Sequence, residues 1–119
     1  MKNYDNAGET VTASLAGGAV SGNFYIINDC LAVATEDAEA NELITFRIVG
    51  RFISAPKVAG VAWGQLERLD WDASANSLTR LGGTTAAGDV EFVALAAEAA
   101  ASSATEGVVI LTPGTGVAA

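Results

Sequence analysis

The chain has 119 residues, of which 50% are hydrophobic; this supports one domain with one core and excludes disorder over the whole length. Its 14 acidic and 6 basic residues give a formal net charge of −8, which repels a phosphate backbone and argues against a primary role in binding nucleic acid. Its apolar runs are far shorter than the ~20 residues that span a bilayer, so no transmembrane helix is expected.

Neither the N-terminus nor the cysteine content points to secretion. Residues 1–6 contain one lysine, but no apolar stretch follows as it would in a secretory signal peptide, so we expect synthesis in the cytosol. The single cysteine, Cys30, cannot form an internal disulfide and lies in an apolar run. We expect it to be a small buried side chain.

Alternation of apolar and polar residues is the main structural signal of the sequence. In residues 44–53, Ile44 and Phe46 share one face, and Gly50 then shifts the pattern, which predicts a strand with a bulge or bend. The same period of two, or a short apolar run between turn residues, recurs along the chain. The expected strands lie at residues 9–15, 24–27, 31–35, 44–53, 66–71, 77–81, 90–95 and 108–112.

Turn residues separate these segments and indicate how they connect. Asn28 and Asp29 predict a turn, and residues 72–76 predict a hairpin in which Asn76 takes a left-handed conformation. Strands spaced in this way predict an all-β fold, either a small β-sandwich or a partly open β-barrel of seven to eight short strands.

One alanine-rich segment, residues 95–104, favours a helix by propensity. It lacks the large apolar face that a docked helix needs, so we expect a strand that runs into a loop, with at most one short helical turn. The expected division of the chain is an N-terminal arm at residues 1–7, a single β domain at 8–112 and a flexible C-terminal tail at 113–119.

The residue types present exclude most catalytic chemistry. The chain has no histidine, which excludes Ser-His-Asp and Cys-His mechanisms and histidine metal sites. Ser54 and Lys57 have the S-x-x-K spacing of serine acyltransferases, but Pro56 disfavours the helical turn that this motif needs. We expect a turn there, with Lys57 as a solvated charge. The glycine pairs at 17–18 and 82–83 lack the following Lys-Ser or Lys-Thr of a nucleotide-binding loop and predict turns. No catalytic residue and no cofactor is therefore expected.

Two groups of acidic residues are candidate cation sites. Asp70 and Asp72 flank Trp71 on one face of a strand, where two carboxylates can share a cation or act as an acid/base pair. The favoured interpretation is that Asp70 faces solvent and Asp72 begins the following turn. Residues 36–42 hold four carboxylates without the spacing and glycine of an EF-hand, which favours a solvated acidic loop. No metal site is expected.

Protein contacts are the remaining kind of site. Trp63 and Trp71 are either core residues or, as the functional alternative, anchors of an oligomer interface. Tyr4 and Asp5 lie in the arm, which can add as a strand to the edge of a partner. Five cations fall in the middle of the sequence, and a patch that includes Arg47 and Arg51 can contact acidic residues of that partner. The alternative for these arginines is pairing within the chain, for instance with Glu42 or Glu67.

A series of short motifs covers most of the chain up to about Leu81. The motifs are MKNY at 1–4, GETV at 8–11, AGGAVSG at 16–22, LAVA at 31–34, GRF at 50–52, PK at 56–57, AWGQ at 62–65 and LDWDA at 69–73. In these motifs the sequence resembles the capsid decoration (cement) proteins of tailed bacteriophages, a family formerly described as a domain of unknown function. It departs from the family pattern at Asp70, where an aromatic residue is common, and in residues 89–107, which are more acidic and richer in alanine.

This resemblance implies a non-enzymatic module on the outer capsid surface of the virion, made in the cytoplasm of the bacterial host. The implied partner is the major capsid protein, with no nucleic acid and no membrane, and we expect a homotrimer, with a dimer as the alternative. A competing interpretation is an extracellular carbohydrate-binding or adhesion module. It requires a secretion signal and a row of exposed aromatic residues, and aromatic residues make up only 7% of the chain.

Overall fold

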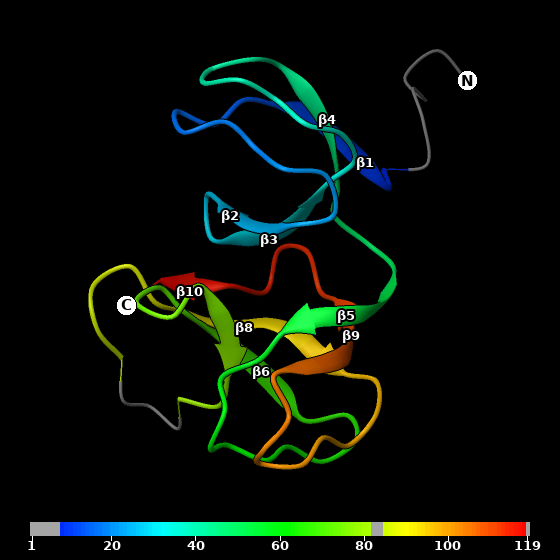
Figure 1. Ribbon diagram of the computed structural model, residues 1–119, viewed down its shortest axis with the longest axis vertical. Coiled ribbons are helices and arrows are strands. Elements are labelled where there is room, and N and C mark those ends of the chain that lie inside the picture. The colour runs from blue at the N-terminus through cyan, green and yellow to red at the C-terminus, as the bar shows by residue number, and fades with distance from the viewer. Residues whose placement is uncertain (1–7, 82–84, 119) are drawn as a thin grey trace.

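The computed structural model describes residues 8–81 and 85–118, and all regular structure in these ranges is β-strand (Figure 1). No described segment is a helix of the length and apolar character needed to cross a membrane. The strands are β1 (Thr10–Ala13), β2 (Phe24–Ile27), β3 (Cys30–Ala34), β4 (Ile44–Arg47), β5 (Arg51–Pro56), β6 (Arg68–Asp72), β7 (Ser77–Thr79), β8 (Val90–Ala96), β9 (Glu106–Leu111) and β10 (Val117–Ala118).

The strands form two antiparallel sheets, and the chain completes the first before it begins the second. The four-stranded sheet has the order β1-β4-β3-β2, and the six-stranded sheet has the order β5-β9-β8-β6-β7 with β10 paired to β8. Figure 1 shows the four-stranded sheet stacked above the six-stranded sheet, with the chain passing between them from β4 to β5. Residues 48–50 make this single crossing.

Strand β3 explains why the first sheet buries both of its faces. Leu31 and Val33 point toward the six-stranded sheet and join its core, whereas Ala32 and Ala34 point to the opposite face. That opposite face packs its own small core around Phe46, which is fully buried. The loops that precede β2 and β4 meet there through a bridge between residues 19 and 38. Alanines on β3 leave room for this close approach of loops to the sheet.

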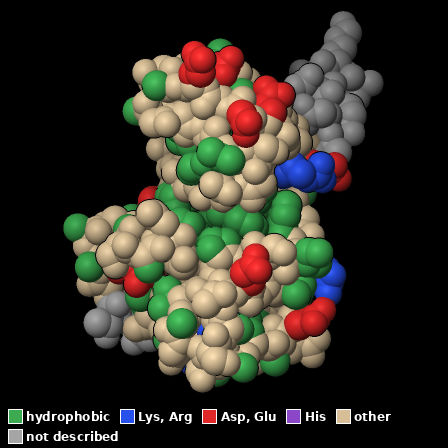
Figure 2. All heavy atoms as spheres, viewed as in Figure 1, with side chains coloured by type: hydrophobic (Ala, Val, Ile, Leu, Met, Phe, Trp, Pro, Cys, Tyr) green, Lys and Arg blue, Asp and Glu red, His purple; other side chains and the backbone are tan. Residues whose placement is uncertain are grey.

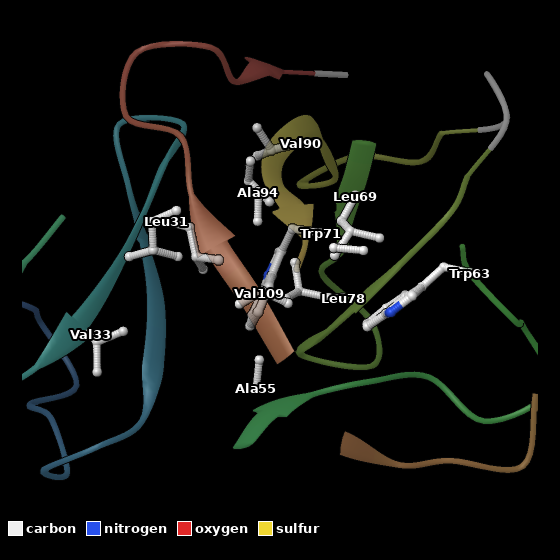
Figure 3. Close-up of a cluster of buried hydrophobic side chains, with 13 residues drawn as sticks. Leu31, Val33, Ala55, Trp63, Leu69, Trp71, Leu78, Val90, Ala94 and Val109 are labelled. Atoms are coloured by element: carbon white, nitrogen blue, oxygen red, sulfur yellow. The ribbon is translucent and has the colours of Figure 1, made fainter. Parts of the chain in front are cut away.

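The larger core belongs to the six-stranded sheet (Figure 3). Leu69 and Trp71 from β6, Leu78 from β7 and Val109 from β9 converge in it, and Trp63 enters from the loop before β6. All five side chains are at most 5% exposed. Burial of this many large side chains supplies most of the hydrophobic free energy of folding of the chain.

The two sheets are joined by apolar packing and not by a hydrogen-bonded ladder between their described strands. The described strands of one sheet form no hydrogen-bonded pair with strands of the other. Each ion pair between described side chains also stays within one sheet and its loops. Contact between the sheets is instead made by Leu31 and Val33 and by the rings of Phe24 and Phe52, which meet edge to face with centroids 5.6 Å apart.

The all-β prediction is confirmed, with ten strands where seven to eight were expected. The hairpin turns at Asn28 and Asp29 and at Asn76 are confirmed, because all three residues have positive φ. The alanine-rich segment is the end of β8 followed by a loop, as expected.

Three expectations were wrong in detail. Residues 44–53 do not form one bent strand, because Gly50 marks the crossing from one sheet to the other. Ser54 and Pro56 lie in β5 and not in a turn. The segment after Pro113 is tied to the sheet, because β10 pairs with β8 and Thr115 Oγ1 donates to the carbonyl of Phe92 or Thr112, each 2.7 Å away.

Candidate functional site

A groove lies at the waist of the molecule, between the two sheets. It has a volume of ≈ 720 Å³, and one wall is formed by the consecutive residues 22–26. The facing wall includes Ser54 and Pro56 of β5, Asn76 and Glu106, with Trp71 between the walls. Figure 2 shows this hollow as a narrowed band of hydrophobic side chains between the two halves of the molecule. We call it the waist groove.

The two arginines of the expected contact patch are exposed and each lies beside a carboxylate of its own chain. Arg47 Nη2 lies 3.8 Å from Glu9 Oε2, and Arg51 Nη2 lies 2.5 Å from Glu98 Oε2. Their side chains are 44% and 52% exposed, so each pair contributes only about 0–1 kcal/mol to stability. Both arginines thus remain accessible to a partner, and their role as contacts stays a prediction.

Some cations do pair within the chain, but with partly different partners from those expected. Arg80 Nε lies 2.6 Å from Oε2 of Glu67, which is one of the two carboxylates expected to form such pairs. Glu42 instead accepts a hydrogen bond from the backbone N–H of Glu39. The arm residues Tyr4 and Asp5 lie outside the described residues, as does the glycine pair at 82–83.

Lys57 is buried, which corrects the expectation of a solvated turn charge. Only 3% of the residue is exposed, and its Nζ donates to the carbonyls of Val58 and Ala104 at 3.0 and 3.2 Å. The same atom lies 5.4 Å from the centroid of the Trp63 ring, within range of a cation–π contact. Ser54 of the S-x-x-K motif is exposed on an extended strand, so the helical arrangement that the motif requires is not formed.

The two tryptophans lie in the core of the single chain. Trp63 is 3% exposed and Trp71 is 5% exposed, and Trp63 Nε1 donates to the carbonyl of Glu98 at 3.2 Å. Side chains this deeply buried cannot contact a partner themselves. They can support an oligomer interface only by holding in place the surface residues that cover them. Their part in an interface stays a prediction. Cys30 is half-buried with a free thiol, more exposed than expected.

Asp70 fixes the backbone of two neighbouring segments and does not simply face solvent. Its Oδ2 accepts from the N–H of Leu81 and its Oδ1 from the N–H of Phe92, both at 2.8 Å. Phe92 has a φ of 53°, in the left-handed region that bulky residues rarely adopt. The guanidinium of Arg68 lies over its ring, 5.2 Å from the centroid. The carboxylate therefore holds a strained residue that positions an arginine.

Asp72 begins the β6–β7 turn, as expected. Its Oδ1 accepts from the hydroxyl and N–H of Ser74 and from the N–H of Ala75, at 2.7 to 3.3 Å. The hydrogen bond from the Ser74 hydroxyl, opposed by partial burial and aided by the two backbone bonds, lowers the pKa of Asp72 below its ordinary value of 3.8.

The lowered pKa of Asp72 predicts a small loss of stability in acid. Because the pKa is lower in the folded state, the stabilisation is fully present above the unfolded pKa and is lost as pH falls through the folded one. We expect the melting temperature of Asp72→Asn to lie slightly below that of the wild type at neutral pH and to converge with it in acid. Thermal unfolding from pH 7 to pH 2 measures this, with Ser74→Ala as the control that raises the pKa. A constant difference across the range would contradict the prediction.

The carboxylates of the acidic loop are exposed. The four carboxylate residues at 36–42 are exposed, and Asp37 Oδ1 accepts from the N–H of Ser21 at 2.8 Å. Among the described residues no three acidic or cysteine side chains converge as a metal site would require. The arrangement is that of an exposed loop in which Glu42 bonds within the loop and Asp37 bonds to the loop before β2.

The waist groove was not predicted from the sequence. The β-branched and aromatic residues at 24–27 predicted β2 as a strand but not as the edge of a sheet, and nothing near Glu106 in sequence indicates that it faces β2.

A family model described as phage cement protein matches residues 5–111 of the chain. No curated protein and no solved structure gives a match.

Proposed function

The chain belongs to the phage cement protein family, and from this premise we propose that it binds the outer surface of the assembled capsid shell and stabilises it against the pressure of packaged DNA. The family match over residues 5–111 is the observation that carries the proposal. A small all-β module with a net charge of −8 is consistent with it, because such a module is repelled by the DNA beneath the shell.

Stabilisation requires only selective binding. A ligand that binds the expanded shell and not its precursor stabilises the expanded state by mass action. Many copies, each bridging neighbouring shell subunits, strengthen this effect through multivalency. The function therefore needs no catalytic residue and no cofactor.

The test uses heads of the encoding phage that were assembled without this protein. Purified protein is added to expanded and to unexpanded shells, and bound copies are quantified after sedimentation. We expect binding to expanded shells only, and a higher temperature of DNA release from decorated heads. Absence of binding to both shells, or an unchanged release temperature, would overturn the proposal.

The N-terminal arm is the proposed anchor on the shell protein. It leads into β1, an edge strand of the four-stranded sheet, so a strand formed by the arm can reach a neighbouring molecule. Deletion of residues 1–6, which removes Tyr4 and Asp5, is expected to leave the melting temperature unchanged and to abolish shell binding. Sedimentation with shells and thermal unfolding measure the two effects. Decoration at wild-type occupancy would exclude the arm as the anchor.

Arg47 and Arg51 are the proposed charged contacts with acidic capsid residues. Replacing both arginines by Glu removes the two exposed ion pairs with Glu9 and Glu98. Because each pair contributes little to stability, we expect little change in melting temperature. We expect association with shells to slow roughly tenfold at low salt and to become less salt-sensitive. Arg80→Glu, which breaks the pair with Glu67, is the control. A lowered melting temperature with normal binding would instead show that the two arginines serve the fold.

The proposed assembly state is a homotrimer. A 12.0 kDa module gains stability by sharing surface, and rings of three fit the local symmetry axes of an icosahedral shell. Light scattering at tens of micromolar is expected to give the mass of three chains. The mass of one chain would count against this assembly.

A further inference from the structure

We propose that the waist groove binds an extended segment of the shell protein, which adds as a strand to the outer edge of β2 and places a Lys or Arg beside Glu106. This inference rests on the proposed function and names the part of the partner that the groove accepts. It concerns a different surface from the N-terminal arm.

The outer edge of β2 offers unpaired backbone groups. The N–H of Ala34 donates to the carbonyl of Asn23, which directs this carbonyl to β3, whereas the N–H of Asn23 donates to the carbonyl of Val20. Successive residues of an antiparallel strand direct their backbone groups to opposite edges, so Phe24 and Ile26 direct their N–H and C=O groups away from β3. Among the described strands β2 pairs only with β3. Two donors and two acceptors are therefore available with the spacing that a fifth strand of this sheet requires.

This edge faces the groove and is held in place. The five consecutive residues 22–26 line the groove, which requires the backbone to be exposed there, because successive side chains point to opposite faces. The side chains of Phe24 and Ile26 pack partly against the large core, and the hydroxyl of Tyr25 accepts from the N–H of Val20 at 2.8 Å. A strand anchored on both faces is a preorganised template, which lowers the entropic cost of adding another strand.

The facing wall determines the chemistry of the occupant. Glu106 is exposed and forms no ion pair with a described residue, and no Lys or Arg lines the groove. A segment with a basic residue therefore complements the groove. A second copy of the chain is disfavoured as the occupant, because it brings a further net charge of −8 to a groove whose one charged lining residue, among those described, is Glu106. Ser54 and Asn76 add polar side chains that can bond to the outer edge of the added strand.

Two neighbouring residues of β5 give a matched test of the groove. Ser54 lines the groove, whereas Ile53 does not line it and is 70% exposed. We expect Ser54→Trp to fill the groove and weaken binding to expanded shells by roughly tenfold or more, and Ile53→Trp to bind as the wild type does. Glu106→Lys, with Glu36→Lys as its control, tests the charge in the same assay. Melting temperatures of all four variants identify any that fail to fold.

Hydrogen exchange tests the strand directly. On binding to shells, the amides of Phe24 and Ile26 are expected to gain protection, while the amides of Tyr25 and Ile27, already directed to β3, change little. Protection of Phe24 and Ile26 that grows with protein concentration without shells would assign the groove to a second copy and overturn the inference.

The possible failures are distinguishable. If the wild type binds shells and folded Ser54→Trp binds equally well, the groove is not the docking site and only this inference falls. If the wild type does not bind expanded shells, the proposed function and this inference both fall.

Discussion

Replacing Trp63 with alanine is expected to lower the free energy of unfolding by about 3–5 kcal/mol, the range for loss of a large buried aromatic side chain. The indole is 3% exposed, and its Nε1 donates to the carbonyl of Glu98. A Cβ at Gly107 would overlap the ring, so the backbone of β9 lies directly against it. The substitution therefore leaves a cavity, an unpaired carbonyl and the buried Lys57 without its aromatic neighbour.

Urea unfolding followed by fluorescence of the remaining Trp71 measures this effect. Trp63→Phe, which keeps a ring but loses the N–H donor, should show a smaller loss. A loss of less than about 1 kcal/mol for the alanine variant would contradict the packing described for this loop.

Replacing Asp70 with alanine is expected to lower the free energy of unfolding by about 2–4 kcal/mol. The substitution removes the acceptors of the N–H groups of Leu81 and Phe92, both bonded at 2.8 Å to its carboxylate. Bonds to a charged acceptor are the stronger kind, and one of them holds Phe92 in a left-handed conformation that costs about 1–3 kcal/mol.

Two controls separate this role from a general effect of charge. Glu91→Ala removes a neighbouring carboxylate that makes no hydrogen bond with a described residue, and it should behave as the wild type. Asp70→Asn retains an acceptor for one of the two N–H groups and should fall between wild type and alanine. Equal unfolding free energies for Asp70→Ala and Glu91→Ala would show that the two hydrogen bonds contribute little.

Local patterns predicted the strands and turns well because their causes are local. The turn at Asn28 and Asp29 and the turn at Asn76 follow from residues that tolerate a positive φ, and the structure confirms both. The division into two sheets could not be predicted in this way. The shift of alternation at Gly50 is equally compatible with a bulge inside one strand, and only the pairing with distant strands places β4 and β5 in different sheets.

Burial and pairing of charges depend on contacts far apart in the sequence. Lys57 was expected in a solvated turn, and it is buried because Ala104, 47 residues away, supplies a carbonyl and Trp63 of the following loop supplies a ring. The partner of Arg51 is Glu98, 47 residues away, which no spacing rule identifies. The waist groove was missed for the same reason, because its two walls meet only through tertiary packing.

The way the two sheets are joined has a thermal consequence. Apolar burial is driven largely by the entropy of water near room temperature and weakens on cooling, whereas hydrogen-bonded ladders do not share this dependence. Since the strands of the two sheets share no ladder, the junction between the sheets rests on apolar contacts made by Phe24, Phe52 and their neighbours. The stability of this junction therefore varies with temperature as apolar burial does, with no ladder to offset the change. Cooling should therefore loosen the junction between the sheets before it loosens either sheet, the reverse of fraying that begins at strand ends.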